Sequence, residues 1–235
     1  PIIDTVAGGV LGDGNIAGRV SMVSPVAVAT DPQGRGIYIV DVTNSFNLIR
    51  FINTTRSTAT IGGQKIAAGA VRTVVGGGLD GADNISGRAA DAGSVTGIAV
   101  STDGGTLYYL DSGGAVLRAL NTSNAAKTIG TSANVAPGNV ATVVSSGFGS
   151  SLNALAVHPT SGEVYVGDAT AGVNKIFKVV SGALTAVAGN GAQSKPEDSF
   201  SAGLATGIPL LQPRAITFDP QGNLYVADTG HARLV

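Results

Sequence analysis

All five tyrosines of this chain lie in or beside a short phrase, Tyr-x-x-Asp, that occurs four times. The four copies are Tyr38/Asp41, Tyr108/Asp111, Tyr165/Asp168 and Tyr225/Asp228, and Tyr109 is the fifth tyrosine. The tyrosines of successive copies are 70, 57 and 60 residues apart. Recurrence at such intervals predicts a fold built from repeated supersecondary units, with the differences in spacing confined to loops.

Each copy ends a segment that predicts two strands joined by a tight turn. In residues 213–228, Ile216 and Phe218 stand two positions apart, which places both on one face of a strand. The Asp-Pro-Gln-Gly that follows predicts a turn, because Pro fixes φ and Gly accepts a positive φ. A short apolar run through Tyr225 predicts the second strand of a hairpin. The same pattern starts at residues 25, 97 and 154.

Two further strands complete each unit. A third apolar run follows every motif aspartate, at residues 47–52, 115–120, 174–179 and 231–235. A fourth strand is marked by Thr-Val-like phrases at residues 5–8, 73–76, 142–145 and 185–189. Four short antiparallel strands make the blade of a β-propeller, so we expect an all-β chain with one propeller domain over residues 1–235. Nothing in the sequence indicates a long amphipathic helix.

The blades resemble NHL repeats of the long bacterial type. The resemblance rests on residues 213–228, on the Asp228-Thr-Gly-His-Ala-Arg-Leu stretch, and on Val-Ala-Gly phrases followed by loops such as Leu11-Gly-Asp-Gly-Asn15. It covers nearly the whole chain, and it implies a propeller, typically of six blades, that serves mostly as a binding platform.

The number of blades has two interpretations at this stage. The chain opens with a fourth-type strand and ends on a third-type strand, so residues 4–8 would complete the last blade and close a four-bladed ring. Alternatively, the four repeats are part of a six-bladed propeller. The first residue is Pro1 rather than Met, for which a cleaved secretory signal and an artificial boundary are the two explanations.

Composition narrows the classes of function. Charged residues make up only 12% of the chain and its net charge is −1, which argues against nucleic acid as a partner. The absence of cysteine rules out disulfides, thiolate metal sites and a cysteine nucleophile. No apolar run approaches the roughly 18 residues needed to span a bilayer, so we expect no membrane insertion.

The motif aspartates have two interpretations. They would form a ring of cation ligands, or each would accept backbone N–H bonds from its own loops, and we favour the second because the residue recurs in every blade. The alternation of connections places these aspartates on the face that carries residues 8–24, 76–94 and 189–212, named here the lead-in loops. Binding residues concentrate on loops held by a rigid scaffold. We therefore expect that removing residues 8–24 and 76–94 would abolish binding and leave the fold intact.

Other candidate sites are weak. Asp80, Asp83 and Asn84 provide oxygen ligands of the kind that calcium prefers, but their spacing does not match a calcium loop and turn formation explains them better. The two histidines, His158 and His231, are interpreted as turn residues rather than zinc ligands.

Three Asn-x-Ser/Thr sequons begin at Asn53, Asn84 and Asn121, all in expected loops. They are candidate glycosylation sites if the protein is secreted.

Two functions remain. The favoured hypothesis is a non-enzymatic, secreted or extracellular scaffold without a required cofactor, whose partner is another protein, other copies in an assembly, or a glycan. The alternative is a propeller enzyme of the metal-dependent lactonase or lyase type, with its site at the central axis. No Gly-x-Ser-x-Gly phrase is present, and few acids remain for an acid/base pair.

Overall fold

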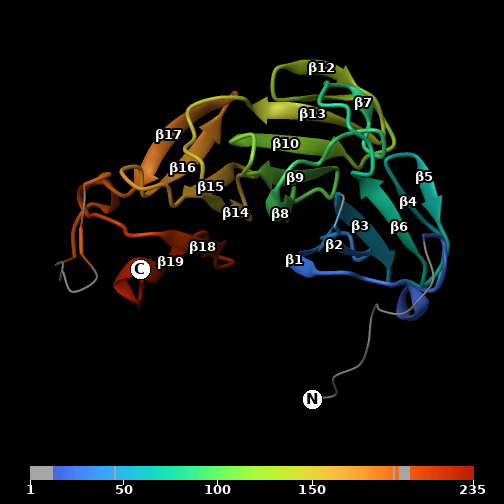
Figure 1. The fold of residues 1–235 in the computed structure, drawn as a ribbon, viewed down its shortest axis with the longest axis horizontal. Helices are drawn as coiled ribbons and strands as arrows, with labels where there is room; N and C mark the ends of the chain where they lie inside the picture. The colour runs from blue at the N-terminus through green and yellow to red at the C-terminus, as the bar shows by residue number, and fades with distance from the viewer. Residues whose placement is uncertain (1–12, 45, 193, 196–201) are drawn as a thin grey trace.

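A computed structural model describes residues 13–44, 46–192, 194–195 and 202–235. These residues form four antiparallel sheets that follow one another as the blades of a β-propeller (Figure 1). The described helices are three single 3₁₀ turns: η1 (Ala17–Arg19), η2 (Ala205–Gly207) and η3 (Thr229–His231). The all-β class predicted from the repeat is confirmed. Among the described residues, no helix is long and apolar enough to cross a membrane.

Every blade is a meander that starts at its innermost strand. Blade 1 consists of β1 (Pro25–Thr30), β2 (Gly36–Val42), β3 (Asn47–Asn53) and β6 (Val71–Val75). Blade 2 consists of β8 (Val95–Val100), β9 (Thr106–Asp111), β10 (Val116–Asn121) and β13 (Asn139–Val144), with the short β7 (Ile85–Ser86) added at its outer edge. Blade 3 consists of β14 (Leu152–Val157), β15 (Val164–Asp168), β16 (Lys175–Val180) and β17 (Ala183–Ala188). Blade 4 consists of β18 (Pro213–Phe218), β19 (Leu224–Asp228) and β20 (Arg233–Leu234).

The strands predicted from the sequence lie close to the observed strands. This includes the fourth strands of blades 1 to 3, which were expected at residues 73–76, 142–145 and 185–189. The turn between the first two strands has a glycine with positive φ in all four blades, as the Asp-Pro-Gln-Gly phrase requires: Gly34, Gly104, Gly162 and Gly222. A bulge also recurs in each first strand, where the partner of the motif aspartate meets the rest of the ladder. A bulge bends and twists a strand, so the same bend is built into every blade.

Two short hairpins were not predicted. β4 (Ala59–Ile61) pairs with β5 (Gln64–Ile66), and β11 (Lys127–Ile129) pairs with β12 (Ser132–Val135). Each hairpin lies in the connection between the third and fourth strands of its blade, on the face opposite the lead-in loops. The expected simple loops over residues 53–70 and 121–140 are therefore partly β structure.

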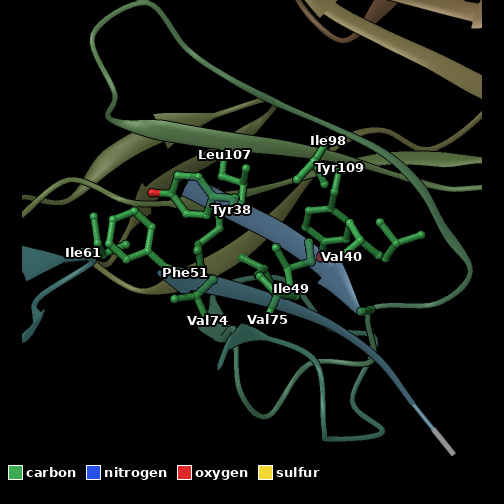
Figure 2. Close-up of a cluster of buried hydrophobic side chains, with 14 of the residues drawn as sticks. Tyr38, Val40, Ile49, Phe51, Ile61, Val74, Val75, Ile98, Leu107 and Tyr109 are labelled. Atoms are coloured by element: carbon green, nitrogen blue, oxygen red, sulfur yellow. The ribbon is translucent and has the colours of Figure 1, made fainter. Parts of the chain in front are cut away.

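The hydrophobic core lies between neighbouring blades. One cluster joins blades 1 and 2, a second joins blades 2 and 3, and a smaller one joins blades 3 and 4. At the first of these boundaries, Tyr38 and Phe51 of blade 1 pack edge to face with ring centroids 4.9 Å apart (Figure 2). The blade faces, rather than a central core, hold the fold together.

The inner strands β1, β8, β14 and β18 contact one another in that order, while β1 and β18 lie at the two ends of the arc (Figure 1). The described blades thus form an open arc. The closing strand expected at residues 4–8 lies outside the described residues.

Candidate functional site

The four motif aspartates end the second strand of their blades, and three of them are fully buried. Each carboxylate accepts a backbone N–H from a residue 17 to 19 positions earlier, at the end of the lead-in loop or connection that enters its own blade. The donors are Ser24 to Asp41 (3.0 Å), Ser94 to Asp111 (2.8 Å), Gly149 to Asp168 (2.7 Å) and Leu211 to Asp228 (2.6 Å). The aspartates act as caps that fix where each inner strand begins, which confirms the structural interpretation.

Additional partners occupy the remaining carboxylate oxygens. Asp41 also accepts from Arg50 Nη1 at 3.2 Å, and Asp168 also accepts the N–H of Thr170 at 2.9 Å. Asp228 accepts from Arg233 Nε at 2.8 Å and contacts the ring nitrogen Nδ1 of His231 at 2.6 Å. Within the described part of the chain, no group of three or more His, Asp or Glu side chains could hold a metal ion.

The tyrosines of the motif belong to the packing between blades. Burial raises the pKa of the Tyr38 phenol and of the Tyr109 phenol well above the ordinary value, because the charged form would be desolvated. Tyr108 is half-buried, and Tyr165 packs on Phe218 of blade 4 with ring centroids 4.9 Å apart. Tyr225 of blade 4 is the most exposed of the four motif tyrosines.

The weak calcium candidates lie in the lead-in loop of blade 2 and hold that loop to the blade. Asp83 accepts the N–H and the hydroxyl of Thr142, both at 2.8 Å, and the hydroxyl of Ser132 at 3.0 Å. Burial opposes ionisation of Asp83, but these hydrogen bonds and the Arg118 guanidinium outweigh it and lower its pKa. The Asp80 carboxylate accepts the local N–H of Ala82 at 2.9 Å.

Asn84 completes the attachment. Its backbone has φ 57°, its N–H donates to the carbonyl of Val140 at 2.7 Å, and its Oδ1 accepts from the N–H of Ala136 at 3.1 Å. Asp83 and Asn84 therefore form hydrogen bonds to residues of blade 2. The Asp80 carboxylate bonds to none of those residues.

The same attachment recurs in blade 1, which the sequence reasoning missed. Asp13 accepts the N–H of Thr73 at 2.7 Å, and Gly14 donates to the carbonyl of Val71 at 2.7 Å. Gly14 and Asn84 both have positive φ. The sequence signal for this attachment was an aspartate followed by Gly or Asn. It lies 59 or 60 residues before the threonine of the fourth strand.

An arginine from the third strand strengthens each attachment. Arg50 reaches Asp13 at 3.6 Å, and Arg118 reaches Asp83 at 3.5 Å. The two lead-in loops are therefore bound along the outer strands, and their own side chains Val20 and Ala90 are fully buried. These contacts argue against the expectation that residues 8–24 and 76–94 can be removed without loss of fold, since deletion of their described parts would uncover the fourth strands.

Two of the three sequons are structural. The side chains of Asn53 and Asn121 are fully buried, and each amide nitrogen donates to backbone carbonyls of the connection that carries the extra hairpin. A glycan on either nitrogen would displace these bonds, so this fold does not accommodate one. Asn84 is exposed and remains the one sequon asparagine at the surface.

Both histidines take structural positions. His158 starts the turn of blade 3, and its Nδ1 accepts the N–H groups of Thr160 and Ser161 at 3.2 and 3.1 Å. His231 lies buried in η3 beside Asp228. The interpretation of both as turn residues is confirmed.

A pocket of about 580 Å³ opens between blades 3 and 4. Its walls are mostly apolar and include His158, Tyr165, Phe218 and Leu224. Arg233 is also in its wall, but its guanidinium is already bonded to Asp228 and to the carbonyl of Pro209.

The lead-in face carries exposed apolar side chains on loops that are tied to one another. Val23 and Leu79 in the lead-in loops, and Phe46 in the turn between β2 and β3, are exposed. The amide of Asn47 donates to the carbonyl of Gly93 at 2.5 Å, which links that turn to the lead-in loop of blade 2. Ser24 accepts the N–H of Val42 at 2.9 Å, which links the turn to the lead-in loop of blade 1. This surface, defined by Val23, Phe46 and Leu79, is named here the lead-in patch.

Comparison with protein families identifies the last repeat. Residues 210–235 match the NHL repeat, which covers the end of the third lead-in loop and the whole of blade 4. Blades 1 to 3 repeat the same strands, turn glycine and capping aspartate. The chain is a β-propeller whose last blade is an NHL repeat.

Solved structures share this propeller fold at low sequence identity. A chain of a nidogen/laminin complex is 15% identical with a TM-score of 0.59, and the match covers 92% of the NHL propeller and 61% of that chain. A streptogramin B lyase is 13% identical with a TM-score of 0.52, covering 91% and 50%. A protein described as a putative gluconolactonase is 15% identical with a TM-score of 0.52, covering 91% and 58%.

The NHL propeller thus spans less than two thirds of each of these three chains. No curated protein sequence matches it. These likenesses establish the fold alone, since the same fold occurs in a protein complex and in an enzyme.

Proposed function

We propose that this propeller is a non-enzymatic, secreted scaffold that binds a protein partner through the lead-in patch. The observation that carries the proposal is the exposure of Val23, Phe46 and Leu79 on loops whose backbones are hydrogen-bonded to the blades. Apolar side chains are typical of the fully buried centre of a protein–protein interface. The neighbour solved in a nidogen/laminin complex supports a protein partner for this fold.

The attachment of the loops favours binding energetically. Ordering a flexible loop or side chain on binding costs about 0.5–1.5 kcal/mol for each immobilised side chain. Asp41 and Asp111 already fix the ends of the first two lead-in loops, and Asp13 and Asp83 fix their middles. The patch is therefore presented in one shape before a partner arrives.

The test compares three versions of the protein on one identified partner. Immobilised wild-type chain is used to capture proteins secreted by the source cells, and a partner identified by mass spectrometry is purified and titrated by calorimetry. We expect Val23→Ser, Phe46→Ser and Leu79→Ser together to weaken binding at least tenfold. Val180→Ser, which alters an exposed apolar side chain next to the β16–β17 turn on the opposite face, serves as the matched control.

Equal affinity of the triple variant and the control would contradict a role for the lead-in patch. Enzymatic removal of glycans from the partner separates protein recognition from glycan recognition, because only the second would lose its binding. The low charged fraction of 12% and the exposed sequon at Asn84 support a secreted location. Detection of the protein in the washed cell pellet but not in the medium would contradict that location.

The enzymatic alternative has its own experiment. Two fold neighbours are described as a lyase and a putative gluconolactonase, so a lactone substrate is the first to assay. We expect no hydrolysis above buffer after incubation with calcium, magnesium, manganese or zinc. Turnover that depends on one of these ions, together with stoichiometric metal in the purified protein, would replace the scaffold proposal.

A further inference from the structure

The outer edges of blades 1 and 2 are each covered by a short extended segment of the chain. Residues 13–16 lie along β6 and residues 83–86 lie along β13, both antiparallel to the strand they meet, and they are named here the edge covers. In blade 1, Val71 donates its N–H to the carbonyl of Asn15 at 3.1 Å and accepts the N–H of Gly14 at 2.7 Å. Each edge cover therefore acts as a short fifth strand of its blade.

Blade 3 has no edge cover among the described residues. The connection that enters it, residues 145–151, is much shorter than the lead-in loops. The outermost strand of the blade is β17, which lies on the outside of the arc (Figure 1). No described strand or bridge pairs with its outer side. Since blade 4 follows β17 in the chain, this open edge belongs to the construction of blade 3 itself.

Equivalent residues of the three outer edges follow from the register of the blades. In each blade, the third-strand residue two positions after the partner of the motif aspartate pairs with one residue of the fourth strand. These pairs are Arg50/Thr73, Arg118/Thr142 and Phe177/Ala186. Ala186 therefore occupies the place that the two threonines occupy in blades 1 and 2.

The backbone N–H of Ala186 points away from its blade. At the equivalent places, the N–H groups of Thr73 and Thr142 point outward and donate to the edge covers at 2.7 and 2.8 Å. Leu184, two residues before Ala186, presents its backbone on the same side. A row of outward donors and acceptors is a template for another strand, and natural edges are usually protected by charge or proline. β17 (Ala183–Ala188) contains neither.

The side chains beside this edge differ in chemistry from those of blades 1 and 2. There, Arg50 and Arg118 each attract the aspartate of an edge cover. Phe177 replaces the arginine in blade 3 and packs on Phe148 with ring centroids 6.3 Å apart. Because Ala186 is small, a side chain directly opposite it on an added strand would reach over it toward Phe177. An apolar side chain suits that place, whereas an aspartate would lack its cation.

A cavity of about 350 Å³ adjoins the start of β17. Its wall includes Ser181 and Gly182 of the β16–β17 turn, together with Asp83 and Thr142 of blade 2. In a segment that runs antiparallel to β17, residues after the paired ones lie toward this turn. A polar side chain from those residues would enter the cavity, so apolar residues should come first and a polar residue should follow.

We propose that the outer edge of β17 binds an extended segment of a partner protein as a fifth strand of blade 3. The segment runs antiparallel to β17, as the edge covers do in their blades, and places an apolar side chain opposite Ala186. In this mode of recognition the main-chain hydrogen bonds supply affinity and alternate side chains supply specificity. The lead-in patch lies on loops of blades 1 and 2, so the two surfaces stand or fall separately.

The first test is amide hydrogen exchange of the chain alone, followed by NMR at low concentration. We expect the amides of Leu184 and Ala186 to exchange at least tenfold faster than those of Thr73 and Thr142, because only the threonines have covered edges. Equal protection would mean that another part of the same chain already covers β17, and the proposal would fail.

The second test selects ligands from random nonapeptides displayed on phage. Peptides that bind the wild-type chain are counter-selected on Ala186→Pro, which removes the outward N–H and leaves the pairing with β16, since edge strands tolerate proline there. We expect apolar residues at alternate positions, a polar residue after them, and no proline. Circular dichroism checks that the variant folds.

A synthetic peptide of the selected sequence is then titrated by calorimetry. Ala186→Pro should weaken its binding at least tenfold, and binding to the wild type should protect the amides of Leu184 and Ala186. Thr185→Val is the matched control, because that side chain is exposed on the other face of β17 and its substitution keeps every backbone donor. Equal affinity of wild type and Ala186→Pro would overturn the proposal, as would the absence of any enriched peptide.

A third test changes the chemistry of the edge. Phe177→Arg gives blade 3 the arginine of blades 1 and 2, so selection on this variant should enrich aspartate at the position that was apolar. Enrichment of the same apolar residue would contradict the contact with Phe177. Sedimentation velocity identifies the other occupant: a wild-type dimer that Ala186→Pro makes monomeric would assign the edge to a second copy and overturn the proposal.

Discussion

Replacing Asp168 by alanine tests whether the repeated aspartates are caps or a functional ring. Asp168 is fully buried and accepts the N–H of Gly149 at 2.7 Å on one carboxylate oxygen and the N–H of Thr170 at 2.9 Å on the other. Alanine would leave both backbone donors without their acceptors. A purely functional carboxylate, by contrast, could be removed at little cost in stability.

The expected loss of stability follows from those two hydrogen bonds. A buried donor left unsatisfied costs about 1–3 kcal/mol, so two such donors cost about 2–6 kcal/mol. Partial access of water to the vacated space brings the expectation for Asp168→Ala to about 3 kcal/mol. Asparagine keeps one acceptor oxygen, so Asp168→Asn should cost about half as much.

Urea unfolding monitored by circular dichroism measures the difference. With an m-value of about 2–3 kcal/mol/M, a loss of 3 kcal/mol lowers the midpoint by about 1–1.5 M. Asp219→Ala is the matched control, because Asp219 also accepts a backbone N–H, from Asn223 at 2.8 Å, but is only half-buried and this hydrogen bond is exposed. If Asp168→Ala shifts the midpoint no more than Asp219→Ala does, the capping role is refuted.

Three further changes test separate parts of the fold. Gly93→Ala should cost about 2–4 kcal/mol in urea unfolding, because Gly93 has φ +65° and a Cβ would lie 2.1 Å from the Asp111 carboxyl carbon. Gly172→Ala, at φ +83° with open space around it, should cost about 1 kcal/mol, and equal costs would contradict the steric argument. Asn53→Ala should speed hydrogen exchange in the β4–β5 hairpin and leave blade 4 unchanged; uniform acceleration would argue against a local anchor. Because the fold lowers the pKa of Asp83, its charge stabilises the protein above about pH 4, and that stability is lost as pH falls through the lowered pKa. Asp83→Asn should therefore flatten the fall in Tm between pH 5 and 2, and an unchanged slope would contradict the assignment.

The blades could be predicted from sequence because their signals are local. Alternation of apolar residues, a turn glycine and a capping aspartate all act within about twenty residues, and each occurs four times in register. Repetition also decides between a structural and a functional interpretation of the aspartates. A carboxylate found at the same position in every blade, such as Asp41 or Asp168, has a structural role at that position. The structure bears this out at all four positions.

The lead-in loops could not be predicted in the same way, because their partners are distant. Asp13 bonds to a residue 60 positions later and Asp83 to one 59 positions later, and Gly- and Asp-rich sequence alone indicates only turns. Asn53 was misread for a related reason. A sequon and a backbone-mimicking asparagine have the same letters, and only burial of its amide separates the two.

Residues with a structural role in the repeat can be set aside when functional residues are sought. Residues that recur in register, including the aspartates, turn glycines and Asp13 with Asp83, are explained by the construction of a blade and its loops. Phe46 and Leu79 are explained by neither, since they are exposed and make no contribution to the buried clusters. A rigid repeat leaves specificity to positions where its columns differ. The side chains that distinguish this propeller from others of the same fold should therefore be sought at the lead-in patch.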